Sequence, residues 1–356
     1  MTLVSPVTGI ALDPVLMFLT GLSGGFVSGF LGLGCGVVIT PILMEFGIPP
    51  LIAISTQLCH AVGTNLTSFL TYKRKLDVDY HLAAYMLLGG LLGTISEWFI
   101  LHYFHDAKLV VKKFAYLYAF VLVIFGFVML IQSFKELKAG GSPKYKKSVS
   151  MRRWMVYIPF HRIFVRSRTE MSVIIPIFVG FLAGVLVSSL GGGNNLFMAP
   201  IITYLIGRIS PVVNGTTALV GCIITAAIAL IYSMNNYCCD MLIVLLLFSG
   251  AVLGSWIGVR LTYSVHRCYI YAAGAIVVFL MASRQIFKLL HHSFVKNVNV
   301  KVNFSNSALS WLTDTDPVKY TLTCLLIIAA IAIVYEFGLQ RLYEEHKVHL
   351  KRRNAR

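Results

Sequence analysis

The chain has 356 residues, of which 57% are hydrophobic and 12% are charged. Soluble proteins carry roughly 25% charged residues, so this composition, with a mean hydropathy of +0.79, excludes both a water-soluble domain and a disordered chain. Lys and Arg number 30 against 14 Asp and Glu, a formal net charge of +16. The basic residues lie in loops beside apolar segments, as in the cytoplasmic loops of membrane proteins, so no nucleic-acid partner is needed to explain them. We predict an all-α, multi-pass membrane protein.

Single membrane spans are predicted along most of the chain. No basic residue precedes the first apolar run, so we expect no cleavable signal peptide. A helix of about 20 apolar residues crosses a ~30 Å hydrocarbon core. Runs of this length occur at residues 52–72, 82–104, 114–134, 211–233, 241–262, 268–290 and 318–338.

Two apolar stretches are too long for one span. Residues 14–46 and 172–206 would each extend about 50 Å as a continuous helix. The first is interrupted by GLGCG, from Gly32 to Gly36, and the second by GGGNN, from Gly191 to Asn195. We predict for each a spanning helix, a break, and a short second helix that reaches only part way back.

The two halves of the chain share special residues at matching positions. Gly21 and Gly25 recur 159 positions later as Gly180 and Gly184. After a two-residue insertion the agreement continues at an offset of 161, matching Pro50, Thr56, Thr64, Asp79, Gly89 and Gly93 with Pro211, Thr217, Thr225, Asp240, Gly250 and Gly254. The chain is therefore interpreted as an internal duplication.

Charge decides how the repeats are related. If both broken stretches return to the side on which they start, most of the 30 basic residues lie inside, as the positive-inside rule favours. Each repeat then has five helical pieces, an odd number, so the repeats are inverted. We expect two transmembrane repeats and an extra C-terminal helix, divided as first repeat 1–134, basic cytoplasmic linker 135–171, second repeat 172–290, external loop 291–317, final helix 318–338 and basic tail 339–356.

Inverted repeats with broken helices are typical of secondary transporters, in which the freed backbone groups line a polar site near the membrane midplane. A half-helix N-terminus carries partial positive charge and suits an anion. We therefore predict a substrate site at the two breaks. The alternative is that the break glycines only allow close helix packing.

The segments GLGCGVVITPILMEFGIPPLIAISTQ, TYKRKLDVDYHLAAYMLLGGLLG and SLGGGNNLFMAPIITYLIGRISPVVNGTTAL resemble the sulfite exporter TauE/SafE family of membrane permeases. The resemblance covers about 20–104 and 175–262. It implies export or uptake of small sulfur-containing or organic anions, such as sulfite or sulfonates, across a bacterial cytoplasmic (inner) membrane. Relatives usually have a more glycine-rich first break, so Cys35 and the pair Asn194-Asn195 depart from the family pattern.

The predicted substrate-binding residues come from the breaks and from the helices that follow them. Hydroxyl and amide groups one turn into those helices are expected to face the breaks, although hydroxyls in membrane helices also bond their own backbone. The set is Gly32, Gly34, Cys35, Gly36, Thr56, Gln57, Gly191, Gly192, Gly193, Asn194, Asn195, Thr216 and Thr217.

Two ionisable residues are candidates for proton coupling. His60 lies near the middle of span 52–72 and Glu97 in the outer third of span 82–104, where ionisable side chains are costly and often functional. The alternatives are a structural, hydrogen-bonded His60 and a Glu97 at the membrane interface. Asp79 and Asp240 are expected to cap the helices that follow them.

Other features receive structural interpretations. Cys238-Cys239 lacks accompanying metal-ligand spacing, and the basic, aromatic linker suggests a segment on anionic headgroups. We expect no metal, no cofactor and no catalytic residue, because the sequence has neither a His/Asp/Glu set at metal-ligand spacing nor a nucleophile with a credible base. It also has no nucleotide-binding motif, so we expect an ion or substrate gradient to supply the energy. The alternatives to an anion carrier are a non-transporting scaffold or assembly subunit and, less favoured, a membrane enzyme. The anion, the direction, the coupling ion and the oligomeric state stay open.

Overall fold

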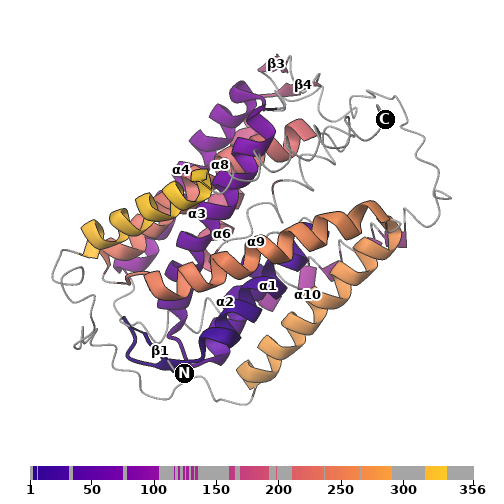
Figure 1. Ribbon diagram of the computed structural model, residues 1–356. Helices are drawn as coiled ribbons and strands as arrows, with labels where there is room; N and C mark the ends of the chain where they lie inside the picture. Colours follow the sequence, from indigo (N-terminus) through magenta and orange to yellow (C-terminus); the bar gives the residue numbers. More distant parts are fainter. Residues whose placement is uncertain are drawn as a thin grey trace, which may run out of the picture.

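The computed structural model describes residues 3–5, 7–31, 35–74, 78–103, 160–164, 169–191, 198, 211–235, 237–264, 267–290 and 317–334, with scattered positions between 116 and 134. The described chain is mostly helical, and its long helices pack into one bundle (Figure 1). This confirms an α-helical membrane protein. Two short β-hairpins, which we did not predict, are described below.

The predicted single spans are confirmed as helices wherever the chain is described. Their ends differ from the predicted ends by a few residues. Among the described residues, three helical segments are long and apolar enough to cross a membrane, at Gly215–Met234, Met241–Gly258 and Pro317–Val334. The predicted span 114–134 falls largely outside the described residues. The predicted loop 291–317, apart from Pro317, and the predicted tail 339–356 also lie outside them. The helices are α3 (Pro50–Arg74), α4 (Tyr80–Tyr103), α8 (Pro211–Met234), α9 (Met241–Ser264), α10 (Arg267–Leu290) and a last helix, Pro317–Val334.

In the first broken stretch, a long helix and a short helix lie on the two sides of the predicted break. Helix α1 (Pro14–Leu31) is followed by the 10-residue helix α2 (Gly36–Glu45). In the second stretch, α6 (Ile174–Leu190) ends at Gly191, whose φ of 73° lies in the left-handed region. Glycine adopts this conformation at little cost, which explains why the helix ends there. Residues 32–34 and 192–197 lie outside the described chain.

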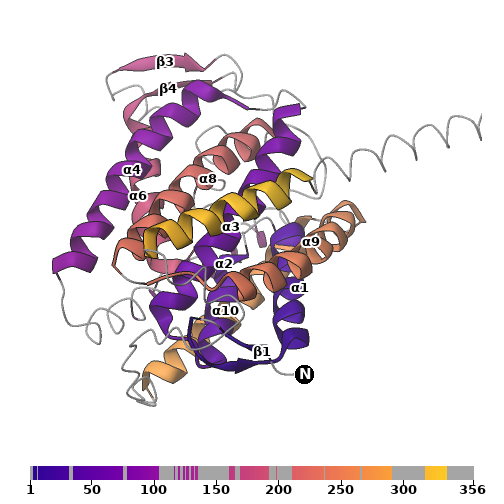
Figure 2. The ribbon, with the colours of Figure 1, turned by 60° about the vertical axis from the view of Figure 1, so that its left-hand side comes forward.

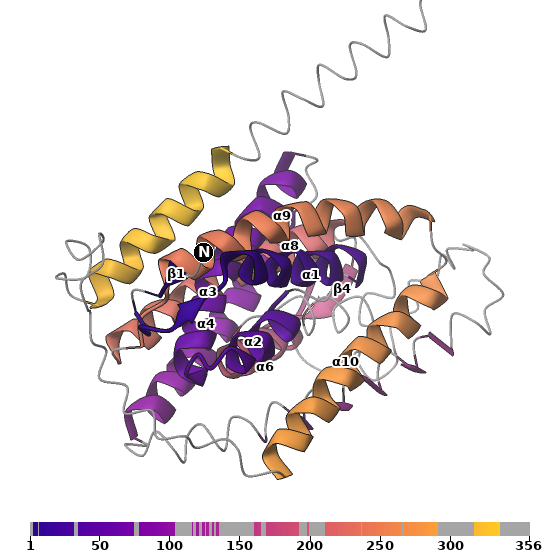
Figure 3. The same cartoon turned by 60° about the horizontal axis from the view of Figure 1, so that its bottom comes forward.

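The main helix contacts join one half of the chain to the other. Helix α1 packs against α9, α4 packs against α6, and α3 packs against α8. Figure 3 shows α1 lying along α9. Each half therefore completes its core with helices from the other half.

Glycine allows the closest of these approaches. A Cβ atom on Gly21 of α1 would lie 2.2 Å from the carbonyl oxygen of Leu247 in α9. On the facing helix, a Cβ on Gly250 would lie 2.2 Å from the carbonyl oxygen of Phe18. No side chain fits at such distances, so the α1–α9 contact requires glycine on both helices.

The α4–α6 contact repeats this arrangement. A Cβ on Gly180 of α6 would lie 2.0 Å from the carbonyl oxygen of Met86, and a Cβ on Gly89 would lie 1.9 Å from that of Ile177. Gly180 and Ile177 lie 159 positions after Gly21 and Phe18, while Met86 and Gly89 lie 161 positions before Leu247 and Gly250. The same positions of the duplicated sequence thus make the same contacts twice.

A β-hairpin precedes the first helix of each half. Strands β1 (Leu3–Val4) and β2 (Ala11–Leu12) pair Leu3 with Leu12, and strands β3 (His161–Phe164) and β4 (Thr169–Ser172) pair Arg162 with Met171. These registers are the same after a shift of 159 positions. Figure 2 shows the two hairpins at opposite ends of the bundle. Hairpin β3–β4 lies largely within the segment predicted as a linker.

Helix α10 lies at the edge of the bundle (Figures 1 and 3). It carries Arg284 inside the predicted span 268–290. The Arg284 guanidinium lies 3.7 Å from the carboxylate of Glu45, at the end of α2. A basic side chain at this depth is expected to have such an acidic partner.

Candidate functional site

Helix α3 places a group of polar side chains in the centre of the bundle. It begins at Pro50, a residue suited to the first helical position, and every residue from 51 to 63 is buried. Ser55, Thr56, Gln57 and His60 are each 0% exposed. Burying polar groups in an apolar interior is costly unless they are hydrogen-bonded, so each of these side chains needs an explanation.

Cys35 joins this group from the end of the first break. It precedes α2, its side chain makes no capping hydrogen bond, and it is 4% exposed. Its Sγ lies 3.4 Å from Nε2 of Gln57, which donates to it, and 3.5 Å from Nδ1 of His60. Gln57 and His60 share one face of α3 because they are three residues apart. The structure therefore brings three predicted site residues into contact.

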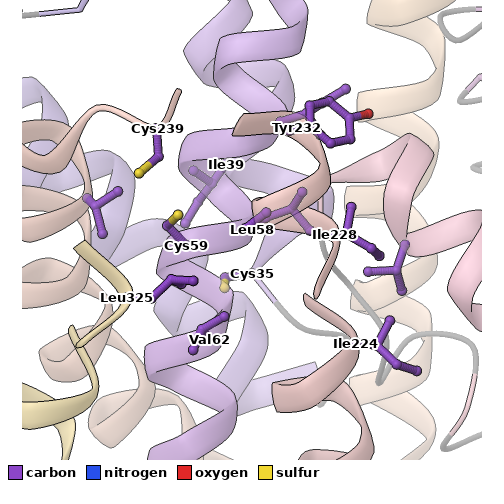
Figure 4. Close-up of a cluster of buried hydrophobic side chains, with 14 of the residues drawn as sticks. Cys35, Ile39, Leu58, Cys59, Val62, Ile224, Ile228, Tyr232, Cys239 and Leu325 are labelled. Carbon is purple, nitrogen blue, oxygen red and sulfur yellow. The ribbon is translucent and has the colours of Figure 1, made fainter. Parts of the chain in front are cut away.

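Apolar side chains surround Cys35. It belongs to the same buried cluster as Ile39 of α2, Leu58 of α3 and Ile224 of α8, which Figure 4 shows in close-up. On another side, the His60 ring packs edge-on against Phe248 of α9, with ring centroids 6.1 Å apart. Helices from both halves of the chain thus enclose the polar group.

Three atoms of this polar group lack a hydrogen-bond partner in the described part of the chain. They are Oγ of Ser55, Oε1 of Gln57 and Nε2 of His60. Each buried atom of this kind costs about 1–3 kcal/mol, and most buried polar atoms in folded proteins are paired. This arrangement is expected where a ligand or water completes the hydrogen bonds.

Thr56 and Thr216 make matching hydrogen bonds between the halves. The Thr56 hydroxyl accepts from the backbone N–H of Asp240, and the Thr216 hydroxyl accepts from that of Asp79, both at 3.0 Å. Thr216 also donates to the carbonyl of Val212. The sequence offset pairs Thr56 with Thr217, one residue beyond the threonine that makes the matching bond.

Asp79 and Asp240 cap the helices that follow them, as predicted. Oδ1 of Asp79 accepts from the N–H of Leu82, and Oδ1 of Asp240 accepts from the N–H of Ile243. Asp240 also accepts from the Ser5 hydroxyl beside β1. Desolvation raises the pKa of the Asp240 carboxyl, just outside the span that begins at Met241, and these hydrogen bonds partly offset that rise.

The start of the second break lies against the first half. A Cβ on Gly191 would lie 2.9 Å from Oγ1 of Thr40 in α2 and 3.1 Å from Cα of Ile54 in α3. Gly191 is therefore adjacent to α2, which Cys35 precedes, and to α3, which carries Gln57. This contact brings one end of the second break to the helices that form the polar group.

The remaining predicted residues are described in part. Gly36 begins α2, Thr217 is buried in α8, and Glu97 lies in α4. Six candidates lie outside the described residues, namely Gly32, Gly34, Gly192, Gly193, Asn194 and Asn195. Ser55 is a buried polar residue that we missed, although its hydroxyl in an otherwise apolar segment was a usable signal.

Cys239 also has neighbours that the sequence did not predict. It interacts with Cys59 of α3 and Cys324 of the last helix, and Figure 4 shows Cys59 and Cys239 near one another. Among the described residues, no group of three or more His, Cys, Asp or Glu side chains is arranged to hold a metal ion.

Comparisons with known proteins agree with the resemblance found in the sequence. The family model for the sulfite exporter TauE/SafE matches residues 17–284. The probable membrane transporter protein YjnA of Bacillus subtilis (strain 168) is 25% identical over 251 residues, covering 70% of this chain and 90% of the relative. The probable membrane transporter protein YunE of the same organism is 25% identical over 283 residues, covering 77% and 97%. No solved structure gives a match. The chain is therefore a membrane transporter of the sulfite exporter TauE/SafE family.

Proposed function

We propose that this transporter is a secondary carrier of small sulfur-containing or organic anions, such as sulfite or sulfonates. The observation that carries the proposal is the contact of Cys35, Gln57 and His60 at the start of half-helix α2, with two buried polar atoms left unpaired. A polar group with spare hydrogen-bonding capacity, enclosed by helices from both halves, is what a carrier needs at its substrate site.

The position of the polar group favours an anion. Cys35 directly precedes α2, whose first N–H groups form the partially positive end of a helix dipole. Glycines at a break let an anion approach backbone N–H groups closely. We therefore retain Gly32, Gly34, Gly36 and the second break from Gly191 to Asn195 as substrate-contacting residues. The proposed set also keeps Thr56, Thr216 and Thr217. The hydroxyls of Thr56 and Thr216 in addition accept hydrogen bonds from the residues that precede α9 and α4.

The architecture proposed for the carrier is a pair of inverted repeats. Three observations support it: the repeated glycine contacts, the matching threonine hydrogen bonds, and hairpins of equal register at opposite ends of the bundle. The second repeat then begins at β3, within the proposed linker 135–171. Alternating access would come from one repeat unit rocking against the other around the central polar group.

His60 and Glu97 are the residues proposed to handle a coupling proton. His60 is fully buried beside the thiol of Cys35 and the amide of Gln57, and imidazole is a common proton carrier in proteins. The Bacillus relatives support a bacterial cytoplasmic membrane. The basic linker and tail would then face anionic headgroups.

Counterflow in proteoliposomes tests the proposed function. Vesicles that contain the purified protein are filled with excess unlabelled sulfite, methanesulfonate or acetate. For at least one of these anions, the vesicles should accumulate the same anion, radiolabelled, from outside. Gln57→Met should reduce the rate, while Thr67→Val should not, because the Thr67 hydroxyl donates to the Gly63 carbonyl of its own helix. Size-exclusion chromatography must first show that the purified protein is folded. If such protein then shows no counterflow with any of the three anions, the scaffold interpretation is favoured.

A further inference from the structure

The contacts around Cys35 are consistent with one set of donors and acceptors. Nε2 of Gln57 donates to the sulfur at 3.4 Å. In the histidine tautomer that we adopt, the thiol keeps its hydrogen and Nδ1 of His60, 3.5 Å from the sulfur, accepts it. A neutral histidine that accepts at Nδ1 carries its hydrogen on Nε2. The two unpaired atoms then differ in kind, because Nε2 of His60 is a donor and Oε1 of Gln57 is an acceptor.

The ligand that satisfies both atoms must offer both hydrogen-bonding roles. An oxygen of the ligand accepts from His60, and an O–H of the ligand donates to Gln57. A fully deprotonated oxyanion has acceptors only, so it would leave Oε1 of Gln57 facing another oxygen. Both side chains are 0% exposed, so water does not replace the missing bond without being enclosed with the substrate.

Charge leads to the same conclusion. The hydrogen-bond partners within the group, Cys35, Gln57 and His60, are neutral in this arrangement. A second negative charge on a substrate would be buried against neutral groups, and burial of each unpaired charge is costly. A substrate that keeps one hydrogen carries one negative charge fewer into the membrane.

We propose that Gln57 and His60 form an acceptor–donor pair that binds the transported oxyanion in a form that still carries one hydrogen on oxygen. This inference rests on the proposed anion transport and narrows its substrate class. Sulfite has such a hydrogen-bearing form near neutral pH, whereas sulfate and sulfonates are anions of strong acids and carry no O–H there. The proton proposed to pass through His60 would then be exchanged with the substrate.

The test compares sulfite with methanesulfonate in the same vesicles. Exchange of radiolabelled sulfite gives its half-saturating concentration, and competition by unlabelled methanesulfonate gives the apparent affinity for an anion without O–H. In the wild type, the half-saturating concentration of total sulfite should rise from about pH 6 to about pH 8, in proportion to the loss of the hydrogen-bearing form of the substrate.

Gln57→Met removes the acceptor while keeping the length of the side chain. We expect it to raise the half-saturating concentration of sulfite about tenfold, the effect of one hydrogen bond, and to leave the competition by methanesulfonate within about twofold. The Thr67→Val control should change neither value. Titratable groups near Gln57 are Cys35, which it contacts, and His60 beyond it, and both remain in this variant.

Two outcomes would overturn the inference. One is a half-saturating sulfite concentration that does not change with pH in the wild type. The other is an equal loss of affinity for sulfite and methanesulfonate in Gln57→Met. Either result would leave anion transport standing, whereas the absence of exchange for any anion would remove the proposed function itself.

Discussion

The hydroxyl of Thr56 accepts a hydrogen bond from the backbone N–H of Asp240, a residue 184 positions away in the chain. Its counterpart joins Thr216 to Asp79 over 137 positions. In both pairs, a threonine on a central helix of one half holds the start of a helix from the other half. The two halves of the duplicated sequence are therefore joined by two matching hydrogen bonds.

Removing either hydroxyl should destabilise the fold. Thr56→Val and Thr216→Val each leave a buried backbone N–H without its acceptor, at a cost of about 1–3 kcal/mol. We expect a lower unfolding temperature in detergent for both variants. Thr67→Val, which loses a bond within its own helix, should change it less. If both variants unfold at the wild-type temperature, these two hydrogen bonds do not stabilise the contact between the halves.

Small additions to the interfacial glycines should disrupt packing. Gly21→Ala and Gly180→Ala place a Cβ 2.2 Å and 2.0 Å from a carbonyl oxygen of the facing helix, so the helices must separate. We expect loss of the monodisperse peak in fluorescence-detected size-exclusion chromatography. Leu19→Ala, on the exposed face of α1, serves as the control. A normal profile for both glycine variants would mean that the helices are less tightly packed than described.

The proposed inverted arrangement would place the two hairpins on opposite sides of the membrane. Ala11 and His161 are exposed positions in β2 and β3. An impermeant maleimide added to intact cells should label Ala11→Cys and reach His161→Cys only after permeabilisation. The unmodified protein provides the background, since its described cysteines are buried or half-buried. Labelling of both positions from the same side would refute the inversion.

A substitution distinguishes the proposed coupling role of His60 from a purely structural role. His60→Gln removes the titrating ring but keeps an amide donor, so counterflow should persist while accumulation driven by a pH gradient is lost. A histidine needed only for packing would affect both assays together. If accumulation keeps its pH dependence in His60→Gln, Glu97 becomes the next residue to replace.

The helices were predictable because long apolar runs and glycine breaks are signals that lie within short segments. The span 52–72 became α3, Pro50–Arg74, and GLGCG separates α1 from α2. The hairpins were not predictable. Strand β1 has only two residues, too few to show alternation, and the basic side chains around β3 suggested a membrane-surface segment.

Part of the candidate site was also predictable. Cys35 was selected as part of the first break, and Gln57 for its position one turn into the helix that follows. His60 was selected as an ionisable residue near the middle of a span. Their contact was not predictable, since Cys35 and His60 are 25 positions apart and meet only once α2 packs against α3. The hydrogen bond from Asp240 to Thr56 depends on the packing of two repeats, which sequence spacing alone does not determine.

Each half packs its helices against helices of the other half, and this also limits the order in which the chain folds during synthesis. When α1 has entered the membrane, the helix that covers its glycine face, α9, has not yet been made. The same holds for α4, which waits for α6. Contacts between such distant segments form slowly, and a half-made chain exposes packing surfaces that invite wrong partners. We therefore expect the first half, produced alone, to insert into the membrane and then aggregate or be degraded, and to be rescued when the second half is supplied as a separate chain.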